Sequence, residues 1–152
     1  DDPSHGWLRY REDEQIDEMG RILGVRSRLT LIGPTREGDF AHDVLLSRIR
    51  YFAPAVNSLR FYREYFKPDA EVQIAKDRIR WLIRYKGEEF FINLDDVELP
   101  DLGYYLEIKS RTWSRVDAED KANYTTELIK LLGGSLEKTV TLDYVEIAAA
   151  QV

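Results

Sequence analysis

Residues 74–85 alternate between polar and apolar positions, a pattern that predicts a β-strand with two unlike faces. Strand geometry turns successive side chains to opposite sides of a sheet. One face then carries four cations and the other is mostly apolar or aromatic: Lys76, Arg78, Arg80 and Arg84 against Ile79, Trp81, Ile83 and Tyr85. Because like charges on one face repel each other, we expect the cationic face to hold an anion. A solvated sheet face is the alternative, since antiparallel sheets often expose one side to water.

The same kind of alternation predicts further strands along the chain. They are expected over residues 7–11, 26–32, 89–97 and 104–110. Apolar residues three or four apart predict a helical stretch over 44–66, broken or kinked at Pro54, and a second helix over 115–132. The acidic stretch 12–24 is expected to form a loop or a short helix. Several antiparallel strands with a few helices indicate an α+β domain.

Composition narrows the choice of partners. The chain has 152 residues, which suits one domain, and its net charge of −6 argues against a nucleic-acid or anionic-membrane partner. It contains no cysteine, which excludes disulfides, thiolate catalysis and cysteine-based zinc sites. No apolar run approaches the length of about 20 residues that a membrane helix needs. We therefore expect a cytoplasmic protein.

Several segments occur in an order known from one protein family. Leu8-Arg9-Tyr10-Arg11 is followed by Leu29-Thr30-Leu31-Ile32-Gly33-Pro34, by Lys76-Asp77-Arg78, and by the stretch from Leu94-Asp95-Asp96-Val97 to Glu107-Ile108-Lys109. This order resembles the CYTH domain, also called the triphosphate tunnel metalloenzyme superfamily. Class IV adenylate cyclases, thiamine triphosphatases and inorganic triphosphatases belong to it. The resemblance covers most of the chain, so residues 1–152 are expected to form a single CYTH-like domain.

The resemblance implies a fold and a set of site residues. The family fold is an eight-stranded antiparallel β-barrel, open as a tunnel, with helices packed outside. By position, the phosphate-binding residues would be Arg9, Arg11, Lys76, Arg78 and Arg80. Asp95 and Glu107 would be the metal ligands, with Mg2+ or Mn2+ as the cofactor. The chemistry is consistent, because arginine meets two phosphate oxygens at once and magnesium prefers oxygen ligands.

The chain also departs from the family pattern. The Glu-x-Glu-x-Lys motif of the family's first strand is not found, so we expect that strand to be absent, with a second copy or a separate segment completing the barrel. Ile32 stands where the family has lysine, and Lys109 replaces the second acid of Glu-Ile-Glu. Either change would weaken metal-dependent turnover.

Three functions follow from the resemblance. The first is metal-dependent hydrolysis of an inorganic or organic triphosphate in a basic tunnel. The second is a non-catalytic module that binds a nucleotide or polyphosphate within a larger protein, which the departures favour. The third is an adenylate cyclase that forms cyclic AMP. A structural role without a ligand is the alternative for each residue. The cations could form a solvated face, Asp95 could act as a cap or form a turn, and Glu107 could belong to a structural ion pair.

Overall fold

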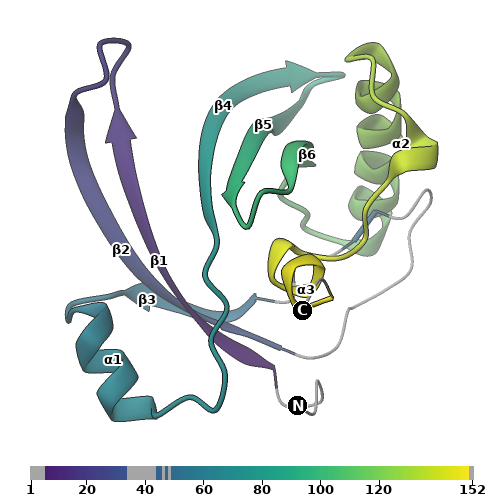
Figure 1. The fold of residues 1–152 in the computed structure, drawn as a ribbon. Helices are drawn as coiled ribbons and strands as arrows, with labels where there is room; N and C mark the ends of the chain where they lie inside the picture. The colour runs from purple at the N-terminus through teal and green to yellow at the C-terminus, as the bar shows by residue number, and fades with distance from the viewer. Residues whose placement is uncertain (1–5, 34–43, 46, 48, 151–152) are drawn as a thin grey trace. The chain divides into compact units, whose positions relative to one another are not determined.

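The computed structural model describes residues 6–33, 44–45, 47 and 49–150. The chain divides into two compact units, one formed by 1–38 with 46–70 and the other by 39–45 with 71–152. The first contains the strands β1 (Trp7–Ile16), β2 (Ile22–Ile32) and β3 (Ile49–Pro54) and the helix α1 (Leu59–Phe66). The second contains β4 (Ala75–Tyr85), β5 (Glu88–Leu99), β6 (Gly103–Lys109), α2 (Arg115–Leu131), the 3-10 turn η3 (Leu136–Lys138) and α3 (Tyr144–Ala149), as Figure 1 shows.

In the first unit, β2 lies between β1 and β3 in an antiparallel sheet. The turn between β1 and β2 depends on Asp17, whose carboxylate accepts hydrogen bonds from the backbone N–H groups of Met19 and Arg21, both at 2.9 Å. Gly20 follows with φ +77°, a conformation that glycine adopts without steric cost. The prediction of a loop or short helix over 12–24 is therefore wrong, because both strands continue to this turn.

The helix predicted over 44–66 is present only in its second part. Residues Ile49–Pro54 form β3, which pairs with β2 so that Phe52 faces Thr30. The stretch is rich in residues that favour strands, and Pro54 stands at its end, where no ladder N–H is needed. Ser58 caps α1 by accepting from the backbone N–H of Phe61, and Tyr62 of α1 packs against Tyr10 of β1.

In the second unit, β5 lies between β4 and β6, again antiparallel. Lys86 and Gly87 both have positive φ angles, 51° and 86°, as a type I′ hairpin turn requires. On the apolar face of this sheet, Tyr85 meets Tyr124 of α2 edge-on, with ring centroids 6.2 Å apart. Buried residues of the sheet and of α2 form the core here: Phe90, Ile92, Ala118, Ala122 and Leu128.

The prediction of a tunnel barrel is wrong. The described residues form two separate three-stranded sheets, whose edges are β1 and β3 in one and β4 and β6 in the other. No strand ladder joins the two sheets within the described part of the chain, and closure of a barrel requires every strand to have two partners. Hydrophobic alternation defines the two faces of a strand but does not specify its neighbours, which explains the error. The α+β class itself is confirmed.

None of the described helices is both long enough and apolar enough to cross a membrane.

Candidate functional site

The polar face of the second sheet brings together most of the residues predicted to form a site. In the strand register Arg78 lies opposite Asp95, and Arg80 lies opposite Asn93. On the other side of β5, Asn93 lies opposite Glu107. Because side chains in register share a face, residues from three strands meet on one surface. The alternation predicted for residues 74–85 is thus confirmed, with the cations on the face opposite Trp81.

Asp95 is the centre of this surface. Its side chain is 0% exposed and accepts four hydrogen bonds. Lys76 Nζ lies 2.7 Å from Oδ2, and Arg78 donates through Nε to Oδ1 at 2.5 Å and through Nη2 to Oδ2 at 2.6 Å. The hydroxyl of Tyr144, at the start of α3, donates to Oδ2 at 2.8 Å.

These contacts determine how the groups around Asp95 ionise. Burial by itself would raise the pKa of Asp95, but the hydrogen bonds from Arg78, Lys76 and Tyr144 outweigh it and hold that pKa far below its usual value. Burial, together with the bond to Asp95, raises the pKa of the Tyr144 phenol. Burial lowers the pKa of Lys76 despite its carboxylate partner. Asp95 is therefore an ionised internal carboxylate with its acceptor positions filled.

Glu107 occupies the more open side of the same surface. Its Oε1 accepts from Asn93 Nδ2 at 2.7 Å and pairs with Lys109 Nζ at 3.0 Å and Arg78 Nη2 at 3.4 Å. Burial opposes its ionisation, but the nearby charges of Lys109 and Arg78 lower its pKa overall. Asn93 is completely buried and also accepts from Arg80 Nε at 2.7 Å. Asn93 thus links Arg80 to Glu107 across β5.

The outer part of this surface is cationic. Arg80 is exposed and its guanidinium lies 5.4 Å from the ring centre of Phe91, while the Lys109 side chain is 55% exposed. Around Asp95, four cations lie with two carboxylates, which leaves two positive charges in excess: Lys76, Arg78, Arg80 and Lys109 against Asp95 and Glu107. We call these six residues, with Asn93 and Tyr144, the basic face. Further along the same face of the sheet, Arg84 and Glu89 pair with each other at 3.7 Å and do not change this excess.

Arg9 and Arg11 belong to the first unit and share a face of β1. Arg11 Nε pairs with Asp13 Oδ1 at 2.5 Å, and Arg28 on β2 lies directly opposite Arg11. Arg9 lies opposite Thr30, and its side chain is half-buried. Since each unit is described by itself, the prediction that Arg9 and Arg11 share one phosphate ligand with the residues of β4 stays a prediction.

The carboxylates of the basic face are engaged by cations, so their assignment as ligands of magnesium or manganese stays a prediction. Magnesium needs open oxygen ligands in near-octahedral geometry, together with several waters. The side chain of Asp95 is buried and accepts four hydrogen bonds from cationic and hydroxyl donors, and Glu107 Oε1 already meets Asn93, Lys109 and Arg78. Among the described residues there is no group of three or more His, Cys, Asp or Glu side chains arranged to hold a metal. An internal ion-pair network describes these contacts better.

Sequence reasoning missed two members of the network. Neither Asn93 nor Tyr144 was predicted to have a role in the site. A buried amide two residues before a buried acid on one strand face is a usable signal for Asn93. Tyr144 comes from a helix 49 positions away from Asp95, and no local pattern indicates that contact.

No protein-family model, curated protein or solved structure matches this chain, so its resemblance to the CYTH domain stays a prediction.

Proposed function

We propose that the second unit binds a small molecule that carries several phosphate groups, on its basic face and without catalysing its hydrolysis. The observation that supports this most directly is the excess of positive charge on one sheet face, with Arg80 and Lys109 at its exposed side. The chain as a whole is acidic, so this local excess is not a consequence of composition.

The spacing of Arg80 and Lys109 favours a polyphosphate over a single phosphate. Arg80 is on β4 and Lys109 is on β6, so β5 lies between them; with the offset of two residues along the strands, their backbones are about 12 Å apart. A chain of phosphates spans such a gap more easily than one phosphate does. The side-chain oxygen of Asn93 accepts a hydrogen bond from Arg80 and so fixes the position of its guanidinium. The Arg80 side chain then loses less conformational entropy when a ligand binds.

Ligand phosphates would have to displace Glu107 from Lys109. That exchange is inexpensive, because partly exposed ion pairs contribute at most about 1 kcal/mol. Lys76 and Arg78 have much less freedom, since each holds the buried carboxylate of Asp95. We therefore assign direct phosphate contact to Arg80 and Lys109, and a supporting role to Lys76 and Arg78.

Calorimetric titration tests the proposal. Tripolyphosphate, ATP and thiamine triphosphate are each titrated into the full chain in the presence of EDTA. We expect binding of at least one of them, weakened about tenfold by Arg80→Gln, which removes one charge-assisted contact. Arg115→Gln is the matched control, because Arg115 is an exposed arginine on α2 that pairs only with Glu119.

Two results would contradict the proposal. One is the absence of binding for all three compounds, and the other is binding that Arg80→Gln leaves unchanged. Phosphate release that requires Mg2+ or Mn2+, measured on the same protein with the metal added in place of EDTA, would support a triphosphatase instead. Formation of cyclic AMP from ATP would support a cyclase.

A further inference from the structure

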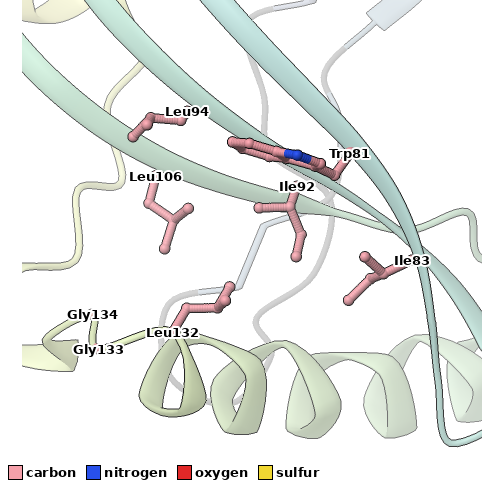
Figure 2. A pocket seen from close by; sticks show the side chains of 8 residues that line it. All are labelled: Trp81, Ile83, Ile92, Leu94, Leu106, Leu132, Gly133 and Gly134. Carbon is pink, nitrogen blue, oxygen red and sulfur yellow. The ribbon is translucent and has the colours of Figure 1, made fainter.

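The apolar face of the second sheet, opposite the basic face, contains an open cavity of about 580 Å3. Figure 2 shows its lining: side chains of β4, β5 and β6 on one side, and Leu132 with two glycines after α2 on the other. Trp81 is 46% exposed, Leu106 is 40% exposed and Leu132 is 50% exposed. Large apolar side chains that line a cavity and remain open to water are typical of an interaction site.

Two acidic side chains lie on the same face of the sheet as this cavity, and one of them, Asp96, is two residues from the lining residue Leu94. Asp77 and Asp96 lie directly opposite each other on this face. Each is two residues away along its strand from the apolar pair Ile79 and Leu94. Like charges directly opposite each other destabilise a sheet. Within the part of the chain that the structure describes, neither carboxylate is paired with a cation, and Asp96 meets only the hydroxyl of Tyr104. The cavity therefore suits an occupant that is apolar and carries a positive charge beside its apolar group.

The helix α1 has these properties. Phe61 and Tyr65, one turn apart, are stacked with ring centroids 5.9 Å apart, and they are 46% and 71% exposed. The Arg60 side chain next to them is 87% exposed and pairs with the also exposed Glu64 at 2.8 Å, an exposed ion pair that exchanges partners at little cost. From Leu59 to Lys67 the segment has three cations and one acid, which makes it basic in an acidic protein. A cavity of about 580 Å3 is large enough to hold two stacked aromatic rings.

We propose that this cavity binds α1 of a second copy of the chain, with the aromatic pair inserted beside Trp81 and Arg60 directed towards Asp77 and Asp96. The proposal is independent of phosphate binding, because it concerns the opposite face of the sheet. It predicts self-association that weakens as salt rises, since charge pairs at its edge contribute to it.

Sedimentation velocity of the full chain over a range of concentrations tests the proposal. Asp77→Lys and Arg60→Glu should each weaken association about tenfold or more, because each places like charges together. The variant that combines both changes should recover much of the lost affinity, since the charges are then complementary again. Arg115→Glu makes the same change of charge on α2 and should have no effect.

A second measurement follows the cavity itself. Trp81 loses contact with water on association, so the tryptophan emission of the wild type should shift to the blue as concentration rises, and Trp81→Phe should abolish that shift. Circular dichroism of each variant shows whether it is folded. A chain that is monomeric at every concentration would overturn the proposal and indicate a different occupant. Association that neither charge reversal changes would overturn it as well.

Discussion

The two sheets of this chain both collect arginines on one face, but they hold them in different ways. In the second sheet, Arg78 pairs with Asp95, whose side chain is 0% exposed. In the first sheet, Arg11 and Arg28 both approach Asp13, at 2.5 Å and 3.9 Å, and the side chain of Asp13 is 34% exposed. A similar pattern of cations along a strand therefore produces a buried network in one unit and a solvated ion pair in the other.

The difference shows which cations are available to a ligand. A carboxylate removed from water must keep its partners, because breaking a buried pair leaves an uncompensated charge. Lys76 and Arg78 must therefore stay paired with Asp95 for the fold to remain stable. A solvated pair exchanges partners at little cost, as the Glu107–Lys109 pair can at the edge of the basic face. Exposure of the acid, more than the number of cations, separates a structural network from a binding surface.

The largest expected effect is that of Asp95→Asn, which removes the charge at the centre of the buried network. The substitution keeps the shape of the side chain but leaves Lys76 and Arg78 without their carboxylate, while both remain largely buried. We expect the free energy of unfolding, measured with urea, to fall by about 3–5 kcal/mol.

Asp96→Asn is the matched control for this measurement. Asp96 is the next residue of β5 and lies on the opposite face, where it meets no cation among the described residues. Its substitution should not lower the free energy of unfolding, because it removes only the repulsion between Asp96 and Asp77 on the neighbouring strand. Equal losses for the two variants would mean that the network around Asp95 does not stabilise the fold.

A smaller effect is expected from pH, and it has a definite sign. The pKa of Asp95 is lowered in the folded chain, so its stabilising contribution is fully present above the pKa of an unfolded aspartate, about 4. As the pH falls below that value, the unfolded chain takes up a proton more readily than the folded one, and the contribution is progressively lost. The difference in unfolding free energy between wild type and Asp95→Asn should therefore be constant from pH 7 to about 5 and shrink below about 4.

Titration of the same pair of proteins with urea at each pH supplies the measurement. Taking the difference removes the contribution of other carboxylates, Glu107 included, to the extent that they titrate alike in both proteins. A difference that stays constant down to pH 3, or one that grows as the pH falls, would contradict the assignment of Asp95 as an ionised group held by cations.

The features that the sequence predicts correctly are those set by residues close together in the chain. Alternation along residues 74–85 correctly predicts both faces of β4, because the period of two is a local property of the strand. The family resemblance groups Asp95 and Glu107, and the strand registers place them on one surface. The partners of each sheet are not local, and the expected barrel was therefore wrong.

Two further predictions were wrong because strand pairing outweighs the local preference of the sequence. The acidic residues of 12–16 were expected to leave the sheet, yet β1 continues to Ile16 because a tight turn at Asp17 returns the chain directly into β2. The apolar spacing of 44–66 suits a helix, but pairing with β2 makes Ile49–Pro54 a strand. In both places tertiary pairing outweighs intrinsic preference.

The smallest effect is expected in the first sheet, and it completes the comparison with Asp95. Asp13→Asn removes the carboxylate that Arg11 and Arg28 share, but all three side chains are about one-third exposed. Water can therefore replace the lost partner, and the free energy of unfolding should fall by less than about 1 kcal/mol. Urea titration at low salt and at 1 M salt measures it, and the small loss should become smaller at high salt, because salt screens exposed charges. A loss comparable to that of Asp95→Asn would mean that the arginines of the first sheet also depend on a buried charge, and the distinction between the two sheets would fail.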